Sequence, residues 1–225
     1  MSSYWKGCSV DYASSEAASG GPADSSVTSV KIVVAGGFGV GKTTFVGSVS
    51  EITPLTTEAV MTAAAEDMDD PSHTPDKTTT TVAMDFGRVT LDVGLILYLF
   101  GTPGQRRFWF MWDDLIHGAI GAVVLVDTRR LADSFPAVDY FESAGLPFIV
   151  AVNGFHGEFP YGVADVREAL SISPHAPMIQ CDARQRPSTK YVLMTLVEHA
   201  LAMKLRKQVR AHAGISDHER SAADR

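Results

Sequence analysis

The sequence predicts an α/β fold, in which helices cover both faces of a mostly parallel six-stranded sheet with one antiparallel edge strand. The first observation behind this prediction is a set of short apolar, β-branched runs at 30–36, 95–101, 122–127 and 147–153. Because these runs lack polar alternation, they are typical of strands buried on both faces. The second observation is that helical patterns separate the runs, as crossovers between parallel strands require.

The antiparallel strand is predicted at 82–91 (VAMDFGRVTL), where residues 92–94 would form the turn of a hairpin that leads into 95–101. The third observation is a terminal helix, marked by apolar residues at spacings of three and four. These residues are Leu193, Leu196, Val197, Ala200, Leu201 and Leu205. Residues 52–80 form a long polar stretch rich in threonine, and a compact domain seldom keeps such a loop without a functional reason.

Length alone favours one domain over two, because 225 residues can bury one substantial core. Residues 1–28 are rich in Ser, Ala, Gly and Asp, and we predict a disordered leader because they hold too little apolar surface to offset the entropy of ordering. We predict the folded domain over residues 29–207. Residues 208–225 are predicted to be a flexible C-terminal tail.

The composition excludes several classes of function. A formal net charge of −7 argues against a general electrostatic grip on nucleic acid or anionic lipid, because both require a surplus of Lys and Arg. The two cysteines, Cys8 and Cys181, make neither a disulfide framework nor a metal motif, and they fit a reducing compartment. No apolar stretch is long enough for direct membrane insertion. We therefore expect a cytoplasmic protein.

A phosphate-binding loop is predicted at 36–44 (GGFGVGKTT), which matches G-x-x-x-x-G-K-[ST] between a strand and a helical segment. The backbone N–H groups of such a loop turn inward around a phosphate, and the helix N-terminus adds a favourable partial charge. Lys42 would reach the β and γ phosphates, and the Thr43 hydroxyl would ligate Mg²⁺. The expected nucleotide-binding residues of this loop are Gly36, Gly39, Val40, Gly41, Lys42, Thr43 and Thr44.

Three later stretches narrow the class of P-loop protein. They are GTPGQ (101–105), AVNGFHG (151–157) and CDAR (181–184), in the order and spacing of a Ras-like G domain. With the P-loop they make the chain similar to a bacterial Ras-like small GTPase. More closely, the segment 85–135, from DFGRVTL to RRLADSF, resembles the MglA-like GTPases of actinobacterial conservon operons. The resemblance covers about residues 29–205.

The resemblance implies GTP and GDP as ligands, Mg²⁺ as cofactor, and roles for several residues. Thr81, with Thr80 as an adjacent alternative, would be the first-switch threonine that senses the γ-phosphate and the metal. Gly104 would donate its backbone N–H to the γ-phosphate, and Gln105 would orient the attacking water. The expected catalytic residues are Gln105, Thr81 and Lys42, and the expected metal ligands are Thr43 and Thr81.

The resemblance also implies which residues hold the base. Asn153 would tie the base-binding loop to the P-loop and the base, and Phe155 could stack on the base. Ala183, flanked by Asp182 and Arg184, would offer its backbone N–H to guanine O6. Asn153 at a strand end could instead simply cap a turn.

The sequence departs from the family pattern at two positions. The usual base-reading motif ends in an aspartate that accepts hydrogen bonds from guanine, and here the residue is His156. A neutral histidine has one acceptor where a carboxylate has two charged oxygens, so guanine preference should weaken unless a neighbour such as Glu158 compensates. Gly101 replaces the second-switch aspartate that holds Mg²⁺ through a water, a change common among MglA-like proteins. Magnesium binding should then depend more on Thr43.

Four aromatic residues follow Gln105 within five positions: Phe108, Trp109, Phe110 and Trp112. Helical geometry cannot point all four inward, so we expect some of this surface to be exposed or covered by a partner. Arg106 and Arg107 are candidates for a catalytic arginine, because residues 52–80 contain none. The family resemblance implies two partners, a roadblock-type regulator or GTPase-activating protein and a membrane sensor-kinase-like protein.

The predicted function is therefore a GTP-binding molecular switch with slow hydrolysis, whose switch regions lie at about 52–81 and 101–112. Two alternatives stay open. One is a nucleotide-binding interaction module with little or no hydrolysis, favoured by the substituted acids and the missing arginine. The other is a P-loop ATPase, because no reliable guanine-reading acid is present.

Overall fold

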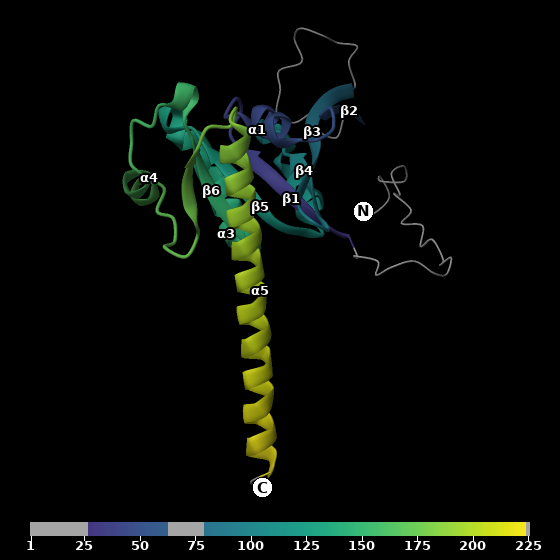
Figure 1. Cartoon of the computed structure of the whole chain (residues 1–225), viewed down its shortest axis with the longest axis vertical. Helices are drawn as coiled ribbons and strands as arrows, with labels where there is room; N and C mark the ends of the chain where they lie inside the picture. The colour runs from purple at the N-terminus through teal and green to yellow at the C-terminus, as the bar shows by residue number, and fades with distance from the viewer. Residues whose placement is uncertain (1–26, 63–78, 224–225) are drawn as a thin grey trace, which may run out of the picture.

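The structure is a computed structural model, and it describes residues 27–62 and 79–223. Almost all of the predicted leader, residues 63–78 of the polar stretch and the last two residues lie outside the described residues. A single sheet forms the centre of the molecule, with the strand order β2-β3-β4-β1-β5-β6-β7 (Figure 1). The strands are β1 (Thr28–Gly36), β2 (Leu55–Thr62), β3 (Thr79–Asp92), β4 (Leu95–Gly101), β5 (Ala119–Val126), β6 (Phe148–Asn153) and β7 (Met178–Cys181).

The predicted fold class is confirmed. The pairs β4-β1, β1-β5, β5-β6 and β6-β7 are parallel, and β3 runs antiparallel to both of its neighbours. The turn between Asp92 and Leu95 makes the predicted hairpin of β3 and β4. The described sheet also contains a seventh strand, β2, which pairs with the outer edge of β3 from within the stretch 52–80. Its sequence, LTTEAVMT, contains three Thr and one Val, which are β-branched residues that suit a strand.

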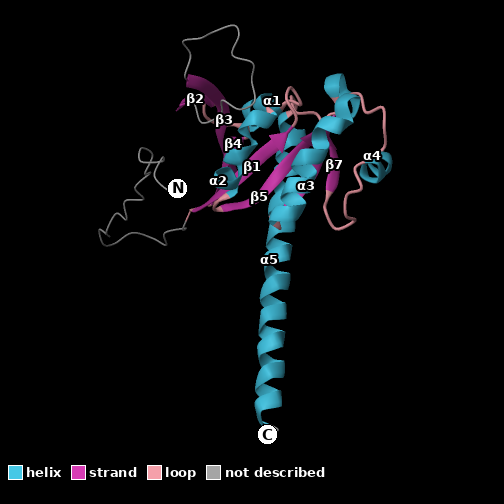
Figure 2. Cartoon of the chain, turned by 180° about the vertical axis from the view of Figure 1, so that it is seen from behind, coloured by secondary structure: helices cyan, strands magenta, loops and turns pink. Residues whose placement is uncertain are grey.

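Helices cover both faces of the sheet (Figure 2). They are α1 (Lys42–Val49), α2 (Trp112–Ile116), α3 (Phe135–Ala144), α4 (Val163–Ala169) and α5 (Arg186–Ala223), with short 3₁₀ helices η2 (Arg106–Met111), η3 (Thr128–Ser134) and η4 (Phe155–Gly157). Successive residues of β1 point to opposite faces. Ile32 packs in the core that contains Phe45 of α1 and Leu193 of α5, whereas Val33 packs in the core that contains Phe141 of α3.

The terminal helix is present and is longer than the sequence predicts. Its buried apolar residues end at Ala200, while Leu201 and Leu205, which the spacing placed on the apolar face, are exposed. The helix continues to Ala223, and its C-terminal part projects away from the sheet (Figure 1). The predicted domain end at residue 207 therefore falls inside a continuous helix. Within the described part of the chain, no helix combines the length and apolar character needed to cross a bilayer.

The carboxyl ends of the parallel strands meet at one edge of the sheet. β1 runs into the P-loop, β4 into residues 102–105, β5 into Asp127, β6 into the segment after Asn153, and β7 into residues 182–185. Open α/β sheets bind ligands at this edge. The topology thus brings together all the motif loops that the sequence singles out.

Candidate nucleotide-binding site

The P-loop joins β1 to α1 through glycines in backbone conformations that other residues rarely adopt. Gly36, Gly39 and Gly41 have φ values of 135°, 74° and 105°. A side chain at Gly36 would collide with the carbonyl oxygen of Leu125, and one at Gly41 would place its Cβ 2.8 Å from Asn153 Nδ2. The glycines are therefore required both by the turn and by the close approach of neighbouring strands.

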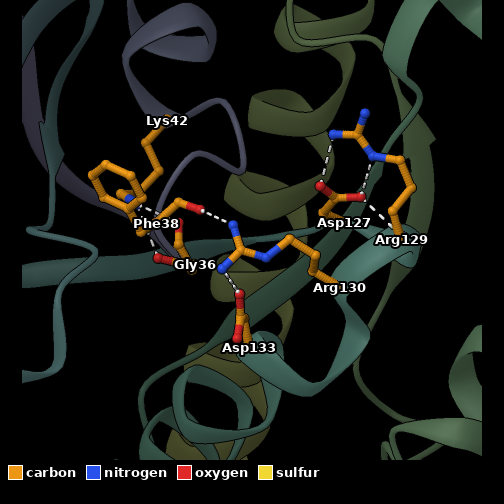
Figure 3. Close-up of polar contacts among 8 residues, drawn as sticks. Gly36, Phe38, Lys42, Asp127, Arg129, Arg130 and Asp133 are labelled. Carbon is orange, nitrogen blue, oxygen red and sulfur yellow. Dashed lines mark hydrogen bonds and ion pairs between the residues drawn. The ribbon is translucent and has the colours of Figure 1, made fainter.

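Lys42 lies buried at the start of α1, with only 8% of its surface exposed. Its ammonium group donates hydrogen bonds to the carbonyl oxygens of Gly36 at 2.9 Å and Gly37 at 2.8 Å. Burial lowers the pKa of Lys42 to about 8, and the nearby Asp85 carboxylate opposes this shift. The side chain curls back over its own loop, at the place where a phosphate-binding loop receives its ligand (Figure 3).

Gly104, which follows β4, lies against this loop. A Cβ at Gly104 would be 2.7 Å from Lys42 Nζ and 2.8 Å from Phe38 Cα. The structure therefore places Gly104 beside the lysine that was expected to reach the γ-phosphate. Gln105 is exposed at the start of η2. The side chains of Arg106 and Arg107 lie outside the described part of the structure.

The carboxylate of Asp85 lies beside Gly101, the residue that stands where the family pattern has an aspartate. Asp85 of β3 pairs directly with Gly101 of β4, and a Cβ at Gly101 would lie 3.0 Å from Asp85 Oδ2. The Thr43 hydroxyl donates a hydrogen bond of 2.7 Å to this oxygen. A carboxylate from the neighbouring strand thus reaches the threonine that was expected to ligate magnesium.

Asp85 is not among the site residues that the sequence predicts. The available signal was an acid inside the apolar strand of a predicted hairpin, in MDFG. Its partner could not be read by counting back from the turn, because the register shifts between Thr90 and Asp92. A one-residue irregularity changes which residues face each other across a pair of strands.

Thr81 lies in β3 and pairs with Val60 of β2. The distance along the strand from Asp85 is roughly 13 Å, since each residue of a strand adds about 3.3 Å. The side chain of Thr81 lies outside the described part of the structure. Its assignment as the first-switch threonine stays a prediction.

Asn153 links the P-loop to the loop after β7. Its side chain is buried, its Nδ2 donates to the Val40 carbonyl oxygen at 2.9 Å, and its Oδ1 accepts from the Ala183 backbone N–H at 3.0 Å. The Gly154 N–H also donates to the carbonyl oxygen of Cys181 at 2.7 Å. These contacts join the ends of β6 and β7 to the phosphate loop, so Asn153 does more than cap a turn.

A cavity of about 140 Å³ lies beside these linked loops. It is lined by Gly41, Thr44, Asn153, Gly154, Phe155, His156, Asp182, Ala183 and Arg184. All the residues that were expected to hold the base line this cavity. Gly154 replaces the lysine of the usual base-reading motif, and a side chain there would collide with the ring of Phe159.

Arg184 connects His156 to Asp182 across this cavity. Its Nε and Nη2 donate to the two carboxylate oxygens of Asp182 at 3.0 and 2.8 Å, and its backbone N–H donates to Oδ1 at 3.0 Å. These bonds hold the pKa of Asp182 below its usual value. The Nη1 of Arg184 lies 3.3 Å from Nδ1 of His156, whose backbone has a φ of 61°.

Phe155 is covered on one face by an arginine. The guanidinium carbon of Arg129 lies 3.5 Å from the centre of the Phe155 ring. Arg129 is held in place by Asp127 through bonds of 2.9 and 2.8 Å (Figure 3). Burial alone would raise the pKa of Asp127, but the hydrogen bonds from Arg129 bring it below the usual value. Only one face of the Phe155 ring thus remains for the stacking that the sequence suggested.

The next arginine contacts the P-loop. Arg130 Nη1 donates to the carbonyl oxygen of Phe38 at 3.4 Å, while Nη2 pairs with Asp133 at 2.5 Å (Figure 3). The carbonyl of Phe38 shares its peptide plane with the N–H of Gly39, and the two point in opposite directions. Arg130 therefore contacts the carbonyl side of a P-loop peptide bond, a contact that no motif in the sequence predicts.

Fold and site together define a P-loop nucleotide-binding protein of the G-domain type. The chain belongs to the family described as conserved hypothetical ATP binding protein, whose model matches residues 34–203. An uncharacterized protein of Methanocaldococcus jannaschii is 29% identical over 126 residues, which are 55% of this chain and 69% of that protein.

Solved G domains share the fold. The G domain of the T. maritima FeoB iron transporter has a TM-score of 0.54 and 17% identity, over 77% of this chain and 99% of that one. The FeoB G domain of Methanococcus jannaschii has a TM-score of 0.51 and 14% identity, over 76% and 98%. The cytosolic domain of T. maritima FeoB in its apo form has a TM-score of 0.56 and 16% identity, and this chain spans 64% of its length. At these identities the similarity shows the fold alone.

Proposed function

We propose that this protein is a molecular switch that binds GTP and GDP with Mg²⁺ and hydrolyses GTP slowly. The observation that carries the proposal is the meeting of Lys42, Gly104, Thr43 and Asp85 around one loop. The cytosolic domain of T. maritima FeoB, which has been crystallised in a GDP form, shares this fold. The backbone N–H groups of the P-loop would hold the phosphates, and the Lys42 ammonium would neutralise their charge.

The residues around Thr43 fit a magnesium ion. Mg²⁺ prefers oxygen ligands and keeps several of its waters, so a site needs few protein groups. The Thr43 hydroxyl and the Asp85 carboxylate supply such oxygens 2.7 Å apart. Thr43 would hold the metal directly and Asp85 would hold it through a water, and the bound ion would neutralise charge on the phosphates. Thr81 is the further ligand that the family resemblance implies once the first switch region becomes ordered.

The segment after β4 would respond to the γ-phosphate. Gly104 lies against Lys42 and Phe38, so a γ-phosphate bound by Lys42 would lie close to this residue, and its backbone N–H would donate to the phosphate. Gln105, the next residue, would orient the attacking water. Hydrolysis would then release the segment 101–112, as in other nucleotide switches. Slow turnover follows from the absence of an arginine in the stretch 52–80.

Two alternatives to this proposal have some support. The family description names ATP, which favours a P-loop ATPase. The absence of an acid at position 156 favours the same alternative. An interaction module that binds nucleotide without hydrolysis is favoured by the lack of an assigned catalytic arginine.

The proposal also includes the regulatory system in which the protein acts and its partners. The resemblance to MglA-like GTPases suggests a conservon-type regulatory system in the cytoplasm. Its partners would be a roadblock-type regulator or GTPase-activating protein and a membrane sensor-kinase-like protein. Phe110 offers a contact surface, because 55% of it is exposed beside Gln105.

A nucleotide-binding and phosphate-release assay tests the switch. The full chain should bind GTP in a magnesium-dependent manner and release phosphate slowly, and Gln105→Leu should retain binding and lose release. Phosphate release that is unchanged in Gln105→Leu would contradict the assigned role of Gln105. Tight GTP binding with no phosphate release by the wild-type chain would support the interaction module. If no nucleoside triphosphate binds to the chain, the whole proposal is overturned.

A further inference from the structure

The side chains of Asn153, Asp182 and Arg184 line the cavity beside His156, and the structure pairs all three. Asn153 Nδ2 donates to the Val40 carbonyl oxygen, and Asn153 Oδ1 accepts from the Ala183 backbone N–H. The Asp182 carboxylate receives three N–H groups of Arg184. A base that enters this cavity therefore finds the side-chain oxygens of Asn153 and Asp182 already bonded.

Arg184 also determines what His156 can offer. A guanidinium group has only donors, so a hydrogen bond between Arg184 Nη1 and His156 Nδ1 at 3.3 Å requires Nδ1 to accept. A neutral ring that accepts at Nδ1 carries its proton on Nε2. The free nitrogen of His156 is then a donor. His156 has a left-handed backbone conformation, with a φ of 61°, and this conformation sets the direction of its Cα–Cβ bond.

This arrangement reverses the hydrogen-bonding character of the base-reading position. Guanine presents two donors there, the N1–H and the exocyclic 2-amino group, and an aspartate would accept both. Nε2–H of His156 accepts neither. Adenine presents the N1 lone pair at the same edge, which a donor can satisfy. A purine donor that is left without an acceptor loses the hydrogen bond that it had with water.

We propose that the base pocket of this chain does not select guanine over adenine, because the His156–Arg184 pair puts a donor where guanine needs an acceptor. The inference rests on the proposed binding of the phosphates by the P-loop, since the base is placed by them. The proposed switch would then accept ATP as well as GTP, and position 156 would set base selectivity independently of Lys42 and Asp85.

Three nucleotides that differ in the hydrogen-bonding groups of the purine test this inference. GTP, ITP and ATP are titrated with Mg²⁺ against the full wild-type chain and against His156→Asp. ITP lacks only the 2-amino group of GTP. Wild type should bind GTP no tighter than ITP or ATP, because neither donor of guanine finds an acceptor. His156→Asp should bind GTP tighter than ITP and ATP by about tenfold or more, since a charged acceptor gains both bonds. Aspartate tolerates the left-handed backbone.

A matched control and a second variant separate the effect of the acceptor at position 156 from the effect of an added charge. His117→Asp introduces the same charge at an exposed residue that precedes β5, at the opposite edge of the sheet, and should leave the three affinities in their wild-type ratio. His156→Asn adds an uncharged acceptor and should give a smaller preference for GTP. It replaces His156→Asp if that variant melts at a much lower temperature than wild type.

The outcomes separate this inference from the proposed function. If wild type binds GTP at least tenfold tighter than ATP and ITP, the inference is wrong and the proposed switch stands. The inference is equally wrong if a folded His156→Asp keeps the wild-type ratios. If Lys42→Ala binds every nucleotide as tightly as wild type, the phosphate site, and with it the proposed function, is wrong.

Discussion

At the scale of single residues, the acid that is absent at position 101 is supplied by the neighbouring strand. Asp85 and Gly101 face each other across β3 and β4, and the Asp85 carboxylate bonds to Thr43. A glycine at 101 is what makes room for that carboxylate, since a Cβ there would lie 3.0 Å from it. Gly101 therefore leaves room for the Asp85 carboxylate, which lies beside Thr43.

Exchanging these two residues tests the arrangement. Asp85→Gly should raise the Mg²⁺ concentration needed for half-maximal nucleotide binding by about tenfold, because one charged hydrogen-bond acceptor is lost. The double variant Asp85→Gly with Gly101→Asp should restore it, since the acid returns from the facing strand. Magnesium titrations with a fluorescent nucleotide measure both. Asp92→Gly, at the other end of β3, is the control, and a double variant no better than the single one would contradict the assignment.

The lowered pKa of Lys42 predicts a pH dependence of nucleotide affinity. Phosphates bind the charged ammonium, which predominates in the free protein only below its pKa of about 8. Affinity should therefore be constant from pH 7 to about 8 and then fall by about tenfold per pH unit. Lys42→Arg keeps its charge over this range and should lose the dependence, whatever its absolute affinity. Equal slopes for the two proteins in equilibrium titrations would show that another group titrates.

At the scale of elements, the connection from β4 into η2 is pressed against the P-loop. The prediction that the aromatic cluster cannot be wholly buried is confirmed, because Phe108 and Trp112 are buried while Phe110 is 55% exposed. Gly104 lies at the contact with Lys42 and Phe38. The segment that contacts the P-loop thus also carries an exposed aromatic side chain, Phe110.

Substitution of Gly104 by alanine tests this coupling. The new Cβ would lie 2.8 Å from Phe38 Cα, so the connection must shift away from the γ-phosphate position. We expect about tenfold weaker binding of GTP with little change for GDP, because only the triphosphate would meet the Gly104 N–H. Gly47→Ala, in α1 with only an ordinary contact to Pro54, is the matched control and should bind both nucleotides as wild type does. Equal losses for GTP and GDP would place Gly104 outside the γ-phosphate site.

At the scale of the whole molecule, α5 has two parts with different roles. Its first part packs on the sheet through Val192, Leu193, Leu196 and Ala200, which are buried. Beyond residue 200 the exposed apolar residues include Leu201, Leu205 and Val209. Among residues 201–209, whose side chains the structure describes, all are exposed except the half-buried Met203, and this part of the helix projects away from the sheet (Figure 1).

Truncation separates these two parts. A chain that ends at Lys207 should melt within about 2 °C of the full chain, because surface groups outside the core contribute little to stability. Leu196→Ala, in the part that packs on the sheet, should instead cost about 2–5 kcal/mol of the free energy of unfolding. Thermal melting followed by circular dichroism measures both. A large drop for the truncated chain would mean that the end of α5 packs on something.

The sequence by itself determined the sheet, the P-loop and the loops that carry the motifs. Apolar runs and glycine patterns are local signals, and the carboxyl ends of parallel strands must meet at one edge. Only the tertiary structure decided the contacts that join distant segments: Asp85 with Thr43, Arg130 with Phe38, and Arg184 with His156. Strand register and the direction of a charged side chain depend on packing between segments far apart in the chain, and no local pattern encodes them.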